Sequence, residues 1–148
     1  AQQGLRLVAA AMVRPGAVVL VEEPTFRGAL DTLRALGARL VGVPSGAEGI
    51  DVDALVRAVD EHRPSLLLLQ STVNNPTGSV LDHFRRSRIA ALSARRGLPV
   101  IDDTAPGDTI LDGDRRPVPI AAGSEPLSDP LAIPPFMPCV TIFLISLP

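Results

Sequence analysis

Short apolar runs alternate with helical patterns along most of the chain, and this alternation constrains the fold more than any other feature. Continuous aliphatic runs of four or five residues are typical of strands that are covered on both faces. Between these runs, apolar residues recur every three or four positions, which predicts amphipathic helices. The expected strands are 17–21, 39–43, 66–69 and 99–101, and the expected helices are 2–13, 25–36, 51–61 and 82–96.

Strands and helices in this order predict an α/β fold, a three-layer sandwich in which helices cover both faces of a mostly parallel sheet. Gly37 and Gly97 follow two of the expected helices, at the position where C-caps favour glycine. Either Asp51 or Asp53 supplies the N-cap of the third helix. Ligands in such sheets bind beyond the carboxyl ends of the strands, so functional side chains are expected in the segments that follow them.

The last part of the chain has a different character. Prolines are frequent from Pro117 to Pro138, and each one fixes φ and removes a backbone donor, so an irregular segment is expected. The apolar run 140–145 is far shorter than the roughly 20 residues of a membrane-spanning helix and predicts a buried strand. We expect residues 1–120 to form part of an α/β domain, and residues 121–148 to form a proline-rich irregular tail with one short strand.

Composition excludes several classes of function. The formal net charge of -2 gives no electrostatic footprint for nucleic acid or for an anionic membrane, so a small molecule is the expected partner. Cys139 is the only cysteine and has no ligand at metal-binding spacing, which argues against a disulfide or metal site and fits the cytoplasm. All 14 basic residues are arginine. The sequence therefore has no lysine that could form a Schiff base.

Other charged residues are expected to lie in solvent. His62 and His83 fall at helix ends, where a solvated face or a dipole contact accounts for them. The arginines of the helix 82–96 are expected to form its solvated face rather than a patch for nucleic acid. These arginines are Arg85, Arg86, Arg88, Arg95 and Arg96.

Two polar segments follow expected strands and would lie at one edge of the sheet. The first runs from Ser71 to Gly78, and the second is Asp102-Asp103-Thr104. In the Asn-Pro-Thr-Gly turn that starts at Asn75, proline fixes φ and glycine permits a positive φ, so the Asn75 amide should have a fixed direction. An ordinary Asn-Pro turn and a strand-end capping role for Asp102 are the alternatives.

The order of these motifs resembles that of fold-type-I, pyridoxal-phosphate-dependent aminotransferases of class I and II. Asn-Pro-Thr-Gly follows an apolar strand, and a later strand ends in Asp102. The stretch from Val21-Glu22-Glu23-Pro24-Thr25-Phe26 to Asp103 most resembles the aminotransferase-like domain of GntR-type regulators of the MocR group. The resemblance covers about residues 1–120 and implies a truncated part of the large, cofactor-binding domain of that fold, one that begins within the domain.

The resemblance implies pyridoxal phosphate as cofactor and a role for five residues. Asn75 would donate a hydrogen bond to the 3-hydroxyl oxygen of the pyridine ring. Asp102 would keep the pyridine nitrogen protonated, which lets the ring act as an electron sink. Phe26 would stack on the ring, with a plain core role as the alternative. Ala1 and Gln2 would lie at a helix N-terminus that binds the phosphate. No catalytic residue or metal ligand is assigned.

Three departures from the family pattern limit what the chain should do alone. Ala105 stands three residues after Asp102, where the family usually has tyrosine. The Schiff-base lysine would follow the apolar run 140–145, where the chain reads Ser146-Leu147-Pro148. The smaller C-terminal domain, which carries the arginine for the substrate carboxylate, lies outside the sequence. We therefore expect these 148 residues to be inactive as an enzyme on their own.

Three functional hypotheses follow. The chain is part of an aminotransferase that moves amino groups between an amino acid and a 2-oxo acid. Alternatively, it is the cofactor- and effector-binding domain of a MocR-type regulator, which would contact DNA only through a helix-turn-helix domain before residue 1. The third hypothesis is a truncated remnant without function. The family usually forms homodimers.

Overall fold

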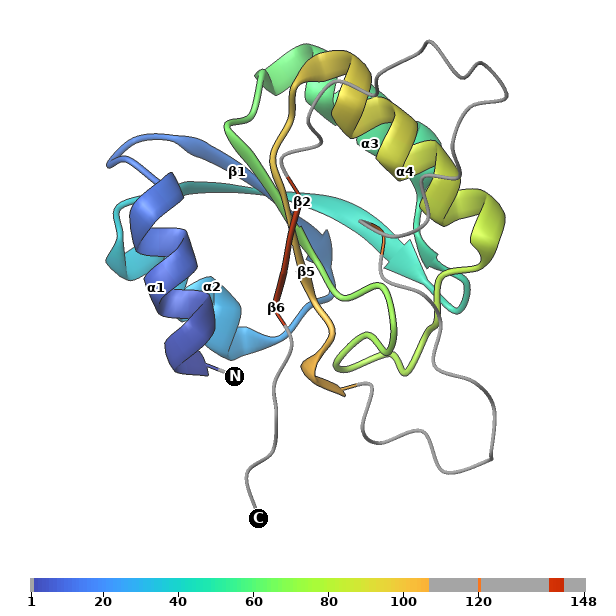
Figure 1. The fold of residues 1–148 in the computed structure, drawn as a ribbon, viewed down its shortest axis with the longest axis horizontal. Coiled ribbons are helices and arrows are strands. Elements are labelled where there is room, and N and C mark those ends of the chain that lie inside the picture. The colour runs from blue at the N-terminus through green and yellow to red at the C-terminus, as the bar shows by residue number, and fades with distance from the viewer. Residues whose placement is uncertain (1, 107–119, 121–138, 143–148) are drawn as a thin grey trace, which may run out of the picture.

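A six-stranded sheet lies between two pairs of helices, in a computed structural model that describes residues 2–106, 120 and 139–142 (Figure 1). The predicted three-layer α/β fold is confirmed. The helices are α1 (Gln2–Met12), α2 (Arg27–Ala35), α3 (Val52–His62) and α4 (His83–Arg96). The strands are β1 (Val18–Glu23), β2 (Arg39–Gly46), β3 (Gly49–Ile50), β4 (Leu66–Leu69), β5 (Val100–Asp103) and β6 (Cys139–Ile142).

The strand order is β3-β2-β1-β4-β5-β6, and every neighbouring pair is parallel except β2 with β3. After β1 the chain adds β2 on one side, and it later returns to add β4 on the other side. The boundary between β1 and β4 is therefore a topological switch point, and the carboxyl ends of the strands open a crevice for ligands at such a point.

The strand β3 was missed by the sequence analysis. It pairs antiparallel with the end of β2, with Ser45 opposite Ile50 and Gly46 opposite Gly49. Only two residues form it, and glycine has a low strand propensity, so no alternating pattern marks it in the sequence.

The sheet is buried on both faces, which explains its continuous apolar runs. In β4, Leu66 and Leu68 pack with the helices α1 and α2, whereas Leu67 and Leu69 pack with α3 and α4. Side chains alternate between the two faces of a strand, so a strand covered twice has no polar face to reveal. Each helix buries one face, and no helix in the described part of the chain is long and apolar enough to cross a membrane.

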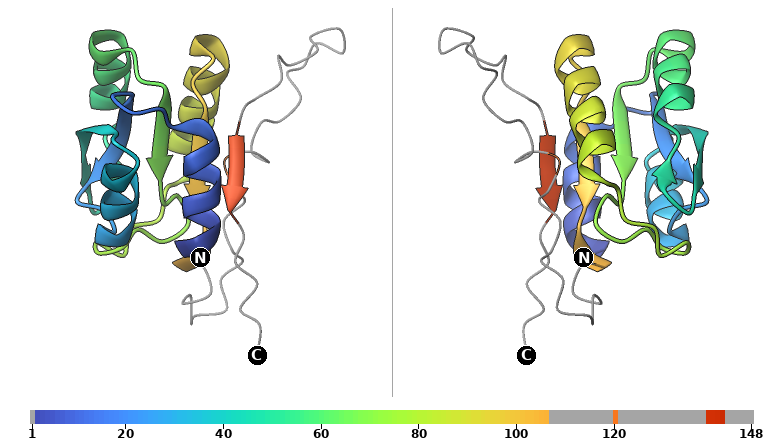
Figure 2. Two further views of the ribbon diagram at one scale, coloured as in Figure 1. Left: turned by 90° about the vertical axis from the view of Figure 1, so that its left-hand side faces the viewer. Right: turned by 90° about the vertical axis from the view of Figure 1, so that its right-hand side faces the viewer.

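The strand β6 lies at the edge of the sheet opposite β3, and its arrow runs parallel to those of β4 and β5 (Figure 2). It pairs with β5, placing Thr141 beside Asp102. The strand expected at 140–145 is thus confirmed from Val140 to Ile142. Ala1, residues 143–148 and the proline-rich segment, apart from Ile120, lie outside the described residues. The boundary at residue 120 stays a prediction, although β6 shares a sheet with β5.

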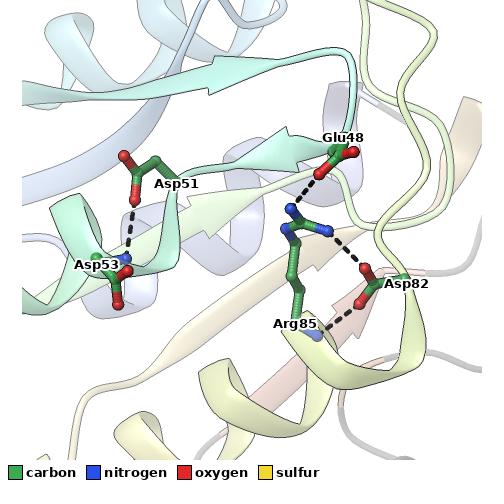
Figure 3. Close-up of polar contacts among 5 residues, drawn as sticks. All are labelled: Glu48, Asp51, Asp53, Asp82 and Arg85. Atoms are coloured by element: carbon green, nitrogen blue, oxygen red, sulfur yellow. Dashed lines mark hydrogen bonds and ion pairs between the residues drawn. The ribbon is translucent and has the colours of Figure 1, made fainter.

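Carboxylate caps define the starts of α3 and α4. Asp51 is the N-cap of α3, because its Oδ1 accepts hydrogen bonds from the backbone N–H groups of Asp53 and Ala54, both at 2.9 Å. At α4, Asp82 accepts from the backbone N–H of Arg85 at 2.7 Å. The Arg85 guanidinium also pairs with Asp82 and with Glu48, and so ties the β2–β3 hairpin to α4 (Figure 3).

Asp51→Ala is expected to lower the free energy of unfolding of the 148-residue chain by about 1 kcal/mol, because two amide donors at the start of α3 lose their acceptor. Asp53→Ala is the matched control, since it removes a neighbouring carboxylate but leaves the cap, and it should cost less. Urea unfolding of both variants measures the difference. Equal losses would contradict the assignment of the cap to Asp51.

Candidate functional site

Buried polar side chains gather where β1, β4 and β5 end. Polar groups are rare in protein cores and are hydrogen-bonded where they occur, so a cluster at the ligand-binding edge of a parallel sheet marks a candidate site. All members are at most 5% exposed. They are Glu22, Gln70, Ser71, Thr72, Asn74, Asp102 and Asp103, together with Arg86 from α4.

Glu22 bridges the switch point. Its Oε2 accepts hydrogen bonds from the backbone N–H of Gln70 at 2.8 Å and from Asn74 Nδ2 at 2.9 Å. The Ser45 hydroxyl lies 3.4 Å from the other oxygen, Oε1. A residue at the end of β1 therefore holds the segment that follows β4.

The Gln70 side chain connects two further parts of the edge. Its Nε2 donates to Asp103 Oδ2 at 3.1 Å, and its Oε1 accepts from the backbone N–H of Asn75 at 2.8 Å. The start of the Asn-Pro-Thr-Gly turn is thereby fixed to the end of β5.

The turn itself is organised around Asn74. Its Oδ1 accepts from the Thr77 backbone N–H at 3.2 Å and from the Thr77 hydroxyl at 2.9 Å, and its carbonyl accepts from Gly78 N–H at 2.7 Å. Gly78 has φ of +71°, which only glycine adopts readily. These contacts leave Asn75 exposed, and its side-chain amide makes no hydrogen bond with the described residues. That amide is free to meet a ligand.

Asp102 is fully buried at the end of β5. Its Oδ1 accepts from the Ser71 backbone N–H at 3.1 Å, and its Oδ2 accepts from the Ser71 hydroxyl at 2.8 Å and from the Ile120 backbone N–H at 3.2 Å. Burial raises the pKa of Asp102, and these hydrogen bonds and the Arg86 charge oppose the rise. A carboxylate has about four acceptor positions, so the described residues leave one on Oδ1 unused. The alternative role predicted for Asp102, a strand-end cap, is thus realised in part, because its carboxylate accepts from the Ser71 and Ile120 backbone N–H groups.

Arg86 corrects the expectation that the arginines of the fourth helix all face solvent. It is only 4% exposed, and its Nε donates to the Leu81 carbonyl at 2.8 Å. The prediction was wrong because Arg86 lies three and four residues before Ile89 and Ala90, on the buried face of α4. That spacing was the available signal. Arg85, Arg88 and Arg96 are partly exposed and form surface ion pairs.

Phe26 and Gln2 meet at the other predicted part of the site. Phe26 is half-buried and packs against the core under α1 and α2. Gln2 Nε2 donates to the Gly28 carbonyl at 3.1 Å. A Cβ on Gly28 would lie 2.5 Å from the Phe26 ring and 2.8 Å from Gln2 Nε2, so both side chains lie over this glycine. No hydrogen bond among the described residues joins this pair to Asn75 or Asp102.

Two orphaned hydroxyl groups flank the predicted positions. Thr25 Oγ1 and Thr72 Oγ1 are buried and have no hydrogen-bond partner within the described residues. Thr25 precedes Phe26, and Thr72 follows Ser71, the partner of Asp102. Unpaired buried hydroxyls are uncommon in folded proteins; here one adjoins Phe26, which is predicted to contact a cofactor, and the other adjoins the partner of Asp102. The set of donors and acceptors therefore fits a polar ligand.

Other features of the surface do not compete with this site. Two open hollows, of about 320 and 400 Å³, are lined by the ion-paired residues of α3, α4 and the hairpin. The described residues contain no group of three or more His, Cys, Asp or Glu that could hold a metal ion. Buried polar groups, rather than concavity, identify the candidate site.

Glu22 makes the stability of the fold depend on pH. Burial is the main cause that raises its pKa from 4.5 to about 7, with a smaller contribution from the charge of Asp102. The folded chain therefore binds the Glu22 proton more tightly than the unfolded chain does. This stabilisation is fully present below pH 4.5 and is lost as the pH rises through 7, by roughly 3 kcal/mol in all.

In Glu22→Gln the side chain does not titrate. The free energy of unfolding should therefore no longer show the fall between pH 4.5 and 7 that is due to Glu22. The amide oxygen still accepts from Gln70 and Asn74, and the NH₂ group donates to the Ser45 hydroxyl. Glu23→Gln, at the exposed neighbouring residue, is the control and should retain the pH dependence of the natural chain. Urea unfolding across this pH range tests the prediction, and parallel curves for the two variants would contradict it.

Comparison with known proteins gives a consistent result. The sequence model of the family described as "Aminotransferase class I and II" matches residues 1–125. The 2-aminoadipate transaminase of Thermus thermophilus is 38% identical over 104 residues, which are 70% of this chain and 26% of that protein. The uncharacterized HTH-type transcriptional regulator YisV of Bacillus subtilis is 30% identical over 122 residues, 82% of this chain and 25% of the regulator.

A solved structure agrees with these sequence matches. It is LysN, the α-aminoadipate aminotransferase of Thermus thermophilus, in complex with N-(5'-phosphopyridoxyl)-L-leucine. The TM-score is 0.68 and the identity 38%, over 70% of this chain and 27% of LysN. The chain thus spans about a quarter of the length of these relatives.

Proposed function

Because the chain belongs to the aminotransferase class I and II family, we propose that it supplies part of a pyridoxal-phosphate site at the carboxyl edge of its sheet. The observation that carries the proposal is the buried Asp102 carboxylate, in the last two residues of β5 and one strand from the switch point, whose Oδ1 accepts a single hydrogen bond from the described residues. The neighbouring orphaned hydroxyl of Thr72 supports the same edge.

Four described residues would hold the cofactor. Asp102 accepts the hydrogen of a protonated pyridine nitrogen, and the exposed Asn75 amide donates to the 3-oxygen of the ring. The half-buried Phe26 offers an aromatic face, and Gln2 lies at the start of α1, where unpaired backbone N–H groups favour a phosphate. When bound, pyridoxal phosphate supplies an electron sink for a carbanion at the α-carbon of an amino acid. The chain's own part is to bind and orient the ring.

Binding to this chain would be noncovalent, since none of its 148 residues is a lysine. Amino-group transfer between an amino acid and a 2-oxo acid is the reaction we propose for the whole protein, as a cytoplasmic homodimer. The chain by itself should bind the cofactor without turning over substrate. A remnant without function is the hypothesis that such binding would exclude.

A regulatory function is the second candidate. It is favoured by the similarity to YisV, which extends over 82% of the chain. In that case the same edge would bind the cofactor together with an amino acid or another small effector. Contact with DNA would belong to a separate helix-turn-helix domain. Cofactor binding is common to both candidates.

Asp102→Asn should weaken binding of pyridoxal phosphate at least tenfold, which corresponds to about 1.4 kcal/mol, because a neutral amide cannot stabilise the pyridinium charge. Titration of the purified chain, followed by absorbance and by dialysis, measures the affinity. Asp103→Asn is the matched control, since Asp103 is equally close to the strand end but is paired with Gln70. Its affinity should stay near that of the natural chain.

Two results would contradict the proposal. A larger loss in Asp103→Asn than in Asp102→Asn would move the ring-nitrogen contact to Asp103. If the natural chain shows no saturable binding of pyridoxal phosphate, the proposal fails and a truncated remnant without function becomes the favoured hypothesis.

A further inference from the structure

Arg86 holds Ser71 by two groups at once. Its Nη1 donates to the Ser71 hydroxyl at 2.8 Å, and its Nη2 donates to the Ser71 carbonyl oxygen. The same carbonyl accepts from the Leu81 N–H at 3.0 Å, and the Leu81 carbonyl accepts from Arg86 Nε. The guanidinium therefore fixes the first residue of the polar segment against α4.

This geometry decides where the hydrogen of the Ser71 hydroxyl points. Arginine has donors and no acceptor, so the hydroxyl oxygen must be the acceptor toward Arg86. Its one hydrogen is then free for Asp102 Oδ2, which lies 2.8 Å away. Asp102 is the acceptor in that contact, just as it is toward the backbone N–H groups of Ser71 and Ile120. All three hydrogen bonds favour the ionised carboxylate.

The positive charge of Arg86 acts in the same direction. Burial lowers the pKa of Arg86, while Asp102 and Asp82 oppose that change. The group nevertheless keeps its charge, because a guanidinium does not deprotonate in proteins. A buried carboxylate is stable only with such a partner, and Ser71 forms the hydrogen-bonded link between the two.

We propose that Arg86 is a positioning residue of this site, which acts through Ser71 to keep the Asp102 carboxylate ionised and fixed at the end of β5. A protonated pyridine nitrogen requires that form of Asp102. The functional importance of this role rests on the proposed function, since it requires that the cofactor binds at Asp102. The effect on Asp102 exists without any cofactor and can be measured in its absence.

Three other charged groups surround the pair in the described residues. Glu22 on β1 is coupled to the charge of Asp102. Asp103 on β5 is paired with the Gln70 amide. Asp82, at the start of α4, acts on Arg86 and binds Arg85. None of them donates a hydrogen bond to Asp102 when ionised, so removal of Arg86 leaves the carboxylate without its positive neighbour.

The experiment follows the side-chain carboxyl of Asp102 by ¹³C NMR as a function of pH, in the full chain without cofactor. The signal is assigned by its loss in Asp102→Asn. Arg86→Met should raise the titration midpoint of Asp102 by about one pH unit or more. Arg86→Lys should raise it less, because lysine keeps the charge but lacks the two-pronged donor. Ser71→Ala should also raise it, since the hydroxyl donor is lost.

Arg85→Met is the matched control. Arg85 is the preceding residue of α4, but it pairs with Glu48 and Asp82 on the surface (Figure 3), so its removal should leave the Asp102 midpoint unchanged. A second readout is the pH dependence of pyridoxal-phosphate affinity. Its acid midpoint should move upward with that of Asp102 in Arg86→Met and stay in place in Arg85→Met.

The outcomes separate this inference from the proposed function. If the natural chain binds no pyridoxal phosphate, the proposed function fails, whereas the NMR midpoints still report on Arg86 and Ser71. If Arg86→Met does not fold, as judged by circular dichroism, Ser71→Ala and Arg86→Lys decide. An Asp102 midpoint that matches the Arg85→Met control in every folded variant would overturn the positioning role.

Discussion

The structure depends on the burial of β4 between β1 and β5. Parallel pairing aligns Leu66 to Leu68 with β1, and Leu67 to Leu69 with β5, so the carboxyl ends of three strands reach one edge. Helices cover both faces of this core, and the chain can place polar groups only where the strands stop. The residues Glu22, Gln70 and Asp102 stand at those ends. One hydrophobic arrangement thus creates both the core and the candidate site.

The polar edge is stable because nearly every buried group in it has a partner. Glu22 holds the segment after β4, Gln70 holds the end of β5, and Arg86 holds Ser71. Removing one member of such a network leaves a buried group unpaired, which costs about 1 to 3 kcal/mol. The unpaired hydroxyls of Thr25 and Thr72 depart from this rule. Within the described residues neither has a partner; Thr25 adjoins Phe26 and Thr72 adjoins Ser71, so a ligand at the proposed site could satisfy them.

Much of the fold was predictable from the sequence. A strand buried on both faces appears as a continuous apolar run, and a helix buried on one face has an apolar residue at every third or fourth position. The edge position of Asn75 and Asp102 followed from the same pattern. The contacts within the edge did not follow, since whether Glu22 meets Gln70 depends on strand order and register. Arg86 was within reach, because its spacing to Ile89 places it inward. The sequence analysis placed Arg86 in solvent because arginine side chains are usually exposed, in spite of this spacing.

Two buried carboxylic acids of the edge, Glu22 and Asp102, lie in different environments. Burial raises the pKa of Glu22 and of Asp102, and the charge of Asp102 adds to the rise in the pKa of Glu22. Among the described residues, Asp102 is linked through Ser71 to the guanidinium of Arg86, whereas no arginine is a cause of the pKa shift of Glu22. Near pH 7 Glu22 therefore carries a proton for part of the time, which reduces its repulsion of Asp102. In the proposed site, Glu22 would be the structural acid and Asp102 the charge available to a cationic ring nitrogen.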